Sequence, residues 1–574
     1  GFAWLDGRDV VGVAEDIFAD LRQKGLFYRK QRYSHRYPHC WRCGSELVYR
    51  LVDEWFISMG PVYDKPREEL TAEEKRASLR YQIMDRVDQI NWYPAFGYDR
   101  EMDWLRNMHD WMISKKRFYG LALPIWECEA CGGFTLVGSK EELRERAVAG
   151  WEEFEGHTPH RPYVDAVKIA CQHCGAETSR IGDVGNPWLD AGIVAFSTLH
   201  YRLDRAYWEK WYPVDWISES FPGQYRNWFY SLLAQSTVLA EEPPFRNLFG
   251  YATLFAEDGR EMHKSWGNAI EFNEAAEQMG ADTMRWLYAS CKPEQNLLFG
   301  FHRGDETRRR FLIPLWNVYS FLVTYANADG WSPDGTAMNR LTTSGGAGEL
   351  DRWIVARLDE TTVEVRAALD VYDAERAAAV LELLLDDLSN WYVRRSRRRF
   401  WKSEADADKA AAYATLYHVL VEFVTLLAPF IPFTTEVMYQ NLVRSVNPDA
   451  PASVHHLFYP TADAAALDHR LLDKMRLAIN TAAVGRSARG AAGKLRQPLA
   501  TAKVFVGSAQ ERQDLEELAD VLAEEINVKR IEIVSEVGEL VSYKLLPNNR
   551  TLGPKLGSLF PAVRGALTAL DPTA

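Results

Sequence analysis

Six of the seven cysteines lie in Cys-x-x-Cys pairs, and this spacing constrains the fold more than any other feature. The pairs are Cys40/Cys43, Cys128/Cys131 and Cys171/Cys174, and Cys291 stands alone. Two intervening residues let both thiolates reach one metal ion, and the glycine after each pair permits the positive φ that turns backbone amides towards the sulfurs. Paired spacing without a secretory signal is typical of metal binding in a reducing compartment. We therefore expect a cytoplasmic protein.

The second and third pairs, in "CEACGG" (128–133) and "CQHCG" (171–175), predict two knuckles that share one structural Zn²⁺. The loop between them is longer than in the commonest zinc patterns, so two independent reduced thiol pairs are the alternative. The first pair, in "CWRCG" (40–44), has no partner pair in the chain. Its partners lie upstream of residue 1, or the pair has lost its metal, or His35 and His39 complete the site.

Length and composition predict a multidomain globular protein. A chain of 574 residues exceeds one core, so three or four domains are expected, and 47% hydrophobic residues suffice for packing. No run of about 18 apolar residues exists, so we expect no membrane span. The formal net charge of −13 argues against non-specific coating of nucleic acid, although arginines concentrate at 303–310 and 394–399.

The chain changes character along its length, which predicts an α/β part followed by an all-α part. Short apolar runs alternate with helical stretches around 196–300, as in βα units. From 305 to 445 the periodicity is helical, with Ile354, Leu358, Val365 and Leu369 on one face. After 465, two strand-like runs flank a charged helix. The expected domains are 1–35, 36–195, 196–304, 305–465 and 466–574.

Several longer blocks resemble one family. They are "YPHCWRCGSELVYRLVDEWFIS" (37–58), "WLRNMHDWMISKKRFYGLALPIW" (104–126), "LWNVYSFLVTYAN" (315–327), "LSNWYVRRSRRRFW" (388–401) and "LLPNNRTLGPKLG" (545–557). The chain is similar to the carboxy-terminal portion of isoleucyl-tRNA synthetases, class I enzymes of the isoleucine, valine and leucine group. In the second block, Tyr119 stands where the family usually has Trp.

The resemblance assigns a role to each predicted domain. It implies the tail of an editing insertion, then a connective region with zinc knuckles. Next come the second half of a Rossmann-like nucleotide fold, a helical anticodon-binding domain and a small α+β tail domain. The amino-terminal catalytic half, with its His-x-Gly-His loop, and the editing core are absent. "EGHTPH" (155–160) has two histidines but falls in the zinc region and is not that loop.

"EMHKSWGN" (261–268) stands where the family has the mobile Lys-Met-Ser-Lys-Ser-x-Gly-Asn loop that closes on ATP. The resemblance implies a catalytic role for Lys264 as the cation that offsets charge developing on pyrophosphate, with Ser265 and His263 beside it. It likewise implies ATP contacts for Gly267 and Asn268. The first lysine of the motif is replaced by Glu261, a carboxylate near a triphosphate. An ordinary polar turn is the alternative.

The adenylate and amino-acid sites are implied in the same way. Where the family has Glu-Gly-x-Asp-Gln, this chain has Ser-Phe-Pro-Gly-Gln (220–224). Gln224 matches the last residue of the family's motif. Glu219, one residue before the position of the motif's first glutamate, is a substitute carboxylate. Trp188 and Trp228 match the two tryptophans that flank the isoleucine side chain, where aromatic walls suit a branched aliphatic group. The alternative for each tryptophan is a core residue.

The arginine run after "LSNWYV" implies contact with the tRNA anticodon stem. The residues expected to meet tRNA are Arg394, Arg395, Arg398 and Trp391. The alternative is a solvated helix end paired with acids such as Asp386 and Asp387.

The resemblance thus implies an isoleucine-tRNA ligase, incomplete and inactive as this chain alone. Its substrates are isoleucine, ATP with Mg²⁺, and tRNA, and a monomer is expected. Valine or leucine as the amino acid is one alternative. A synthetase-derived tRNA-binding protein without activation chemistry is another.

Overall fold

The computed structural model describes residues 3–10, 12–40, 44–49, 51–333, 348–402, 406–491, 493, 496–534 and 546–569. Internal contacts divide the chain into two compact units. Unit 1 comprises residues 1–59 and 109–190, and unit 2 comprises 60–108 and 191–574. The five predicted domain boundaries stay predictions, but the segment 60–108, expected with the zinc region, belongs to unit 2.

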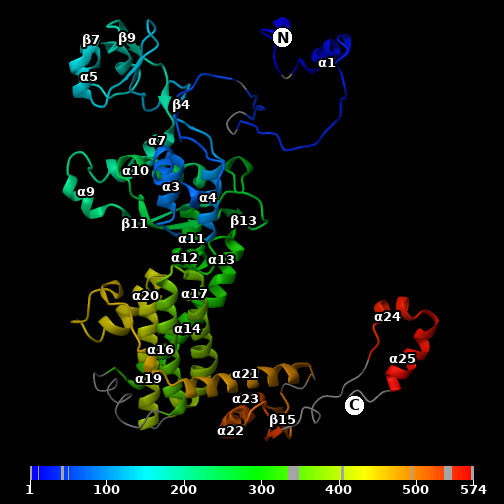
Figure 1. Ribbon diagram of the computed structural model, residues 1–574. Coiled ribbons are helices and arrows are strands. Elements are labelled where there is room, and N and C mark those ends of the chain that lie inside the picture. Colours follow the sequence, from blue (N-terminus) through cyan, green and yellow to red (C-terminus); the bar gives the residue numbers. More distant parts are fainter. Residues whose placement is uncertain are drawn as a thin grey trace. The chain divides into compact units, whose positions relative to one another are not determined.

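Unit 1 is built on a five-stranded antiparallel sheet in the order β6-β5-β9-β8-β7. The strands are β5 (Ile125–Glu127), β6 (Phe134–Leu136), β7 (Ala147–Ala149), β8 (Lys168–Ala170) and β9 (Glu177–Arg180), with helices α5 (Lys140–Arg146) and α6 (Trp151–Phe154) between β6 and β8. Trp126, Phe154 and Ile169 fill its core. The β5–β6 and β8–β9 hairpins carry the second and third cysteine pairs at their turns. Figure 1 shows this part of unit 1 at the labels β7, β9 and α5.

Smaller elements complete unit 1. They are α1 (Ala14–Gln23), β1 (Phe56–Ile57) paired with β3 (Trp111–Met112), β4 (Ser114–Lys115) paired with β10 (Val184–Gly185), and α7 (Pro187–Gly192), which ends across the division between the units. The pairing of β4 with β10 joins the block around 104–126 to the end of the zinc region.

Unit 2 begins with a parallel three-stranded sheet in the order β11-β12-β2. Its strands are β2 (Asn91–Tyr93), β11 (Val214–Ser220) and β12 (Phe245–Tyr251). Helix α10 (Trp228–Leu239) connects β11 to β12, so the expected βα unit is confirmed. Helix α3 (Leu79–Val87) packs against the largely buried α10, and α4 (Phe96–Asn107) packs against α3.

The remaining short elements of this part precede the sheet strands or follow them. They are α2 (Ala72–Ala77), α8 (Val194–Ser197), α9 (Arg205–Trp211), α11 (Phe272–Met279), α12 (Ala281–Ala289), α13 (Phe301–Thr307) and the parallel pair β13 (Leu254–Ala256) and β14 (Leu297–Phe299).

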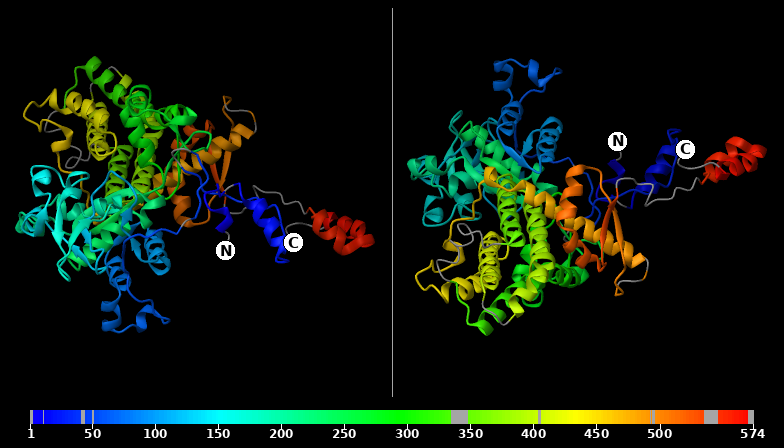
Figure 2. Two further views of the ribbon diagram at one scale, coloured as in Figure 1. Left: turned by 90° about the horizontal axis from the view of Figure 1, so that it is seen from above. Right: turned by 90° about the horizontal axis from the view of Figure 1, so that it is seen from below.

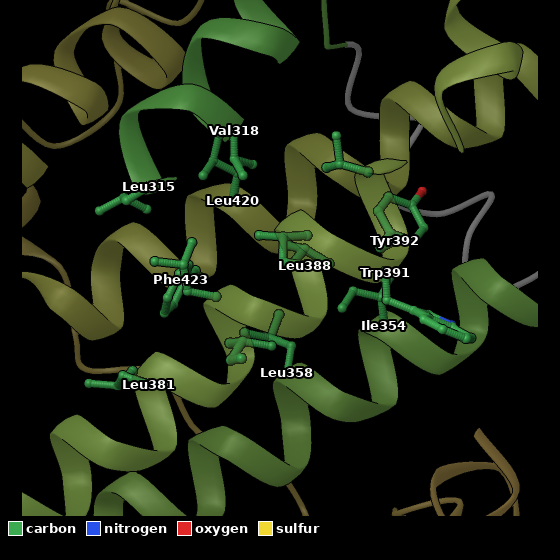
Figure 3. Close-up of a cluster of buried hydrophobic side chains, with 14 of the residues drawn as sticks. Leu315, Val318, Ile354, Leu358, Leu381, Leu388, Trp391, Tyr392, Leu420 and Phe423 are labelled. Carbon is green, nitrogen blue, oxygen red and sulfur yellow. The ribbon is translucent and has the colours of Figure 1, made fainter. Parts of the chain in front are cut away.

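A helical bundle follows, in which the long helices run side by side (Figures 1 and 2). It contains α14 (Ile313–Asp329), α16 (Glu349–Leu369), α17 (Ala374–Asp386), α18 (Arg394–Trp401), α19 (Ala407–Leu427) and α20 (Pro432–Tyr439). The predicted apolar face is confirmed, because Ile354, Leu358 and Val365 are buried and Leu369 packs against them. Leu388, Leu420 and Phe423 meet them in the same core (Figure 3).

In the described part of the helical region, π-helical turns occur at Arg308–Leu312, Asp387–Val393 and Gln440–Arg444. Each leads directly into or out of an α-helix. Helix α19 is long and apolar enough to cross a membrane, but 67% of its apolar stretch is buried inside the protein, as expected of a core helix.

The tail part crosses the bundle with α21 (His469–Ala491) and continues into a small α+β arrangement (Figure 1). The predicted strands are confirmed as β15 (Ala502–Phe505) and β16 (Ile531–Val534), which pair in parallel. The single helix expected between them is two helices, α22 (Ala509–Glu517) and α23 (Ala519–Ile526), because the backbone leaves the helical region at Leu518. Helices α24 (Asn549–Leu556) and α25 (Phe560–Ala569) follow.

Candidate functional site

The carboxyl ends of β11 and β12 meet at one edge of the parallel sheet, where Ser220 lies opposite Tyr251. Ligands of open α/β sheets bind at such edges. A cavity of about 610 Å³ opens here and is lined by Ser220, Tyr251, Tyr288, Cys291 and Tyr372, among others. Sequence reasoning singled out none of the last four for this site, because they come from segments distant in the sequence and carry no motif.

Gln224 and Glu219 lie on either side of this strand end. Gln224 is in the 3₁₀ turn Phe221–Arg226, and its side-chain oxygen accepts a hydrogen bond from the backbone N–H of Trp228 (3.2 Å). The carboxylate of Glu219 accepts one from the N–H of Ser220 (2.7 Å). Burial, and next the charge of Glu219, raise the pKa of Tyr251. The structure therefore places the kept Gln and the substitute carboxylate at the same strand end.

The loop 261–268 is closed by Asn268. Its side chain accepts from the N–H of His263 (2.9 Å) and donates to the carbonyl oxygen of Glu261 (2.8 Å). Gly267 adopts φ +69°, which favours glycine, directly after the 3₁₀ turn Lys264–Trp266. Asn268 and Gly267 thus shape the loop. For Ser265 the structure describes the backbone only.

Charges within this loop are arranged so that its lysine stays available. The carboxylate of Glu261 meets the His263 ring at 3.1 Å, and both side chains are exposed. Lys264 is exposed and has no hydrogen-bond or ion-pair partner for its ammonium among the described residues. The carboxylate that replaces the family's first lysine therefore pairs with the histidine that replaces its serine.

The four cysteines Cys128, Cys131, Cys171 and Cys174 converge, with sulfur atoms all within 4.8 Å of one another. The Cys128–Cys174 and Cys131–Cys171 sulfur distances are both 3.6 Å. Tetrahedral Zn²⁺ with bonds of about 2.3 Å separates its sulfurs by about 3.8 Å. The backbone N–H of His173 donates to the Cys171 sulfur; this contact, then one from the N–H of Cys174 and those from neighbouring thiols, lower the pKa of the Cys171 thiol to about 6. The donor set fits zinc.

The loop at Cys40 has the backbone hydrogen bonds of the other two knuckles. The N–H of Cys40 donates to the oxygen five residues on (2.7 Å), and the N–H of Gly44 donates back to Cys40 (2.8 Å). Cys128 with Gly132 and Cys171 with Gly175 repeat this pattern. Cys43 lies outside the described residues. The rings of His35 and His39 make hydrogen bonds to backbone carbonyls.

The two candidate pocket tryptophans belong to different units. Trp188 is in α7, where its backbone N–H donates to the side-chain oxygen of Asn186 (3.1 Å), within unit 1. Trp228 begins α10 in unit 2, and its indole N–H donates to the carbonyl oxygen of Ala191 (2.9 Å). Both are half-buried, so neither is a plain core residue.

The arginines of α18 are largely engaged inside unit 2. Arg395 meets Glu525 at 2.8 Å, and Arg394 also pairs with this carboxylate, which is only 2% exposed. Arg398 is different, since its side chain is 88% exposed and lies 3.8 Å from Glu524. The pairing acids come from α23, about 130 residues on, and not from Asp386 and Asp387 as the alternative proposed.

Trp391 corrects the expectation that it meets tRNA. It is 3% exposed and lies in the bundle core, where its indole N–H donates to the Met475 sulfur (3.3 Å; Figure 3). A ring enclosed by packed helices cannot stack on a base without unfolding its surroundings. Trp391 and Tyr392 follow the buried Leu388 by three and four residues, so helical periodicity also favours an inward position for them.

Comparison with known proteins gives two consecutive family matches. Residues 10–299 match the model "tRNA synthetases class I (I, L, M and V)", and residues 351–503 match "Anticodon-binding domain of tRNA ligase". Curated relatives named isoleucine--tRNA ligase include those of Thermus thermophilus (40% identity; 96% of this chain, 51% of the relative), Dehalococcoides mccartyi (39%; 94%, 51%) and Methanothermobacter thermautotrophicus (36%; 99%, 52%). The chain spans about half the length of the curated relatives it matches.

Proposed function

The chain belongs to the class I tRNA synthetases of the isoleucine, leucine, methionine and valine group, and from this membership we propose that it supplies about half of an isoleucine-tRNA ligase. The observation that carries the proposal is the order of the two matches, a synthetase segment followed by an anticodon-binding segment, in a chain similar along its whole length to isoleucine--tRNA ligases.

The proposed reaction has two steps. The carboxylate of isoleucine attacks the α-phosphate of ATP and releases pyrophosphate, which leaves isoleucyl-adenylate. A ribose hydroxyl of tRNA then takes the acyl group and releases AMP. In the first step negative charge grows on pyrophosphate, and a positioned cation stabilises it. Lys264, exposed and unpaired among the described residues, is that cation, with Mg²⁺ bound as part of the ATP substrate.

Other residues position the reactants in this proposal. Asn268 and Gly267 hold the loop that carries Lys264, while Gln224 and Glu219 meet the adenylate at the strand end. By their match to the family's motifs, Trp188 and Trp228 are the residues assigned to the isoleucine side chain. Valine or leucine as the substrate is the close alternative.

Zinc has a structural role in the proposal. One Zn²⁺ would be held by Cys128, Cys131, Cys171 and Cys174. The ion would cross-link the two hairpins and take no part in the reaction. The backbone hydrogen bonds at Cys40 support a second knuckle-like loop there.

On the tRNA side, we assign phosphate contacts to the exposed Arg398, with Arg394 and Arg395 next to it on α18. The protein would act in the cytoplasm as a monomer. A tRNA-binding relative without activation chemistry is favoured by two observations, the Glu261–His263 pair and the absence of carboxylates at 220–223.

The test is isoleucine-dependent ATP–pyrophosphate exchange, on this chain alone and on a protein that also carries the half its relatives have. Exchange in the second protein only is the expected result. If neither protein showed exchange but tRNA binding were intact, the remaining interpretation would be a tRNA-binding protein without activation chemistry. Exchange with valine or leucine in place of isoleucine would change the substrate.

A further inference from the structure

Unit 1 exposes aromatic rings at a position where neither the metal nor the catalytic proposal uses them. Phe118 and Tyr119, just after β4, are 61% and 81% exposed. Soluble proteins usually bury such rings, and clustered exposed ones mark interaction surfaces. One histidine of "EGHTPH" (155–160), a stretch that the sequence left without a role, lies against Tyr119: it is His160.

These rings form ordered pairs. The ring of Tyr119 lies nearly parallel to that of His160, with centroids 6.0 Å apart and planes 14° apart. His157 stacks on Tyr163 at 3.8 Å and 6°. We call these four residues and Phe118 the aromatic surface.

An arginine fixes the two segments that carry the aromatic surface. Arg161 lies over the ring of Phe118, with its guanidinium carbon 4.9 Å from the centroid. It also donates to the carbonyl oxygens of Gly182 (2.7 Å) and Arg117 (3.3 Å), and to Asp165 (2.8 Å). Because its donors are engaged on both sides, the rings are held in place before any partner arrives.

Cations border the aromatic surface. Lys116, 53% exposed, pairs with Asp183 (2.8 Å), and Arg117 is exposed with no side-chain partner among the described residues. Exposed ring faces next to cations are the combination that binds single-stranded nucleic acid, since bases stack on the rings and the cations meet phosphates. A double helix offers no free base faces, so this geometry favours a single strand.

We propose that the aromatic surface and Arg117 bind an unpaired RNA segment by base stacking. The inference rests on the proposed function for its partner, which there is an unpaired segment of the tRNA. It assigns bases to Phe118 and Tyr119 and a phosphate to Arg117. Stacking does not read base identity, so weak sequence preference is expected.

The test uses the full chain and a labelled single-stranded RNA of about ten nucleotides, followed by fluorescence anisotropy. Phe118→Ala and Tyr119→Ala should each weaken binding by roughly 5- to 100-fold, the range for one stacked base. Tyr119→Trp should keep affinity, because it retains a stacking face. Arg117→Ala should lower the slope of log affinity against log salt by about one. Tyr207→Ala, on α9 in unit 2, is the control and should bind as the parent does.

A second measurement localises the RNA, since arginines of unit 2 could also bind it. Ultraviolet cross-linking followed by peptide mapping should place the RNA on 115–119 and 157–163. Unchanged affinity in both alanine variants would overturn the proposal, as would equal affinity for a duplex. So would a change in sedimentation caused by Phe118→Ala, which would indicate a second copy of the chain as the occupant. Isoleucine-dependent exchange needs no RNA, so the two proposals fail separately.

Discussion

At the scale of single residues, the substitutions in the 261–268 loop compensate one another locally. Glu261 would repel a triphosphate, yet its carboxylate is turned to His263 while Lys264 points to no partner among the described residues. The motif was readable from the sequence because its residues are contiguous. The Glu261–His263 pairing was not, because it depends on the bend that Asn268 and Gly267 impose.

This arrangement predicts how the loop tolerates charge. In a protein that also carries the half its relatives have, Lys264→Ala should lower pyrophosphate exchange by roughly 10²- to 10³-fold, the usual cost of one transition-state donor. Glu261→Lys should raise it by roughly tenfold, since it removes a repulsion and adds a cation. Glu277→Lys on α11 carries the same charge change away from the loop. If the Lys264→Ala variant exchanged pyrophosphate as fast as the parent protein, Lys264 could not have the assigned role.

A second residue, Glu101 on α4, has a fully buried carboxylate with no hydrogen-bond partner among the described residues. Burial raises its pKa well above the usual value, so the folded protein keeps the proton while the unfolded chain loses it. Stability is therefore lost as pH rises from about 4.5 towards the folded pKa. Burial, then the charge of Glu101, raise the pKa of Tyr225 to about 12.

Glu101→Leu should stabilise the protein at pH 8 by about 1–3 kcal/mol, the cost of an unpaired buried polar group. At pH 5 the gain should shrink, because both states of the parent then hold more of their protons. Urea unfolding at the two pH values measures this difference. Glu68→Leu, at an exposed position in the same unit, should show no such pH dependence.

At the scale of elements, the helix α18 shows which interactions were predictable. Its helical state and basic face follow from the sequence alone. Its partners do not, because Asp351 and Glu525 reach it only after the chain has folded back over 48 and 130 residues. Arg399 makes two hydrogen bonds to Asp351 (both 2.8 Å), and Tyr392 donates to the same carboxylate (2.7 Å).

The difference between neighbouring arginines of α18 is testable. Asp351 is 1% exposed, so Arg399→Ala leaves a buried charge without its main partner and should cost about 3–5 kcal/mol. Arg398→Ala should change stability by less than about 0.5 kcal/mol, since its side chain is exposed. Denaturant unfolding gives both values. For tRNA affinity the ranking of the two variants should be the opposite. At temperatures where both are folded, Arg398→Ala should bind tRNA more weakly than Arg399→Ala.

At the scale of the whole molecule, the sequence indicated the α/β part, the helical part and the α+β tail, since each has its own periodicity. It did not indicate that 60–108 belongs with unit 2, because that depends on β2 pairing with β12 across more than 150 residues. The convergence of the four cysteines was predictable because two pairs at knuckle spacing can share one tetrahedral site. The aromatic surface was not, since it joins two segments about 40 residues apart.

Two compact units predict separable unfolding. A chelator, or Cys174→Ser, should lower the thermal transition of unit 1, because metal binding contributes directly to folding at such sites. The helical circular dichroism of unit 2 should persist to its own transition temperature. Metal analysis should give about one zinc per chain. A single transition that shifts as a whole would show that the units do not unfold separately.

The π-helical turn Asp387–Val393 sets the phase of everything after it on its helix. One residue more or less rotates a following α-helix by about 100°. Deleting one residue here would leave a regular, better hydrogen-bonded helix, yet would swing Arg394, Arg395 and Arg399 away from both acids. The irregular turn thus sets the rotation of α18 about its own axis. Homologues with one residue more or fewer in this segment should therefore carry their positive charge on a different side of the bundle.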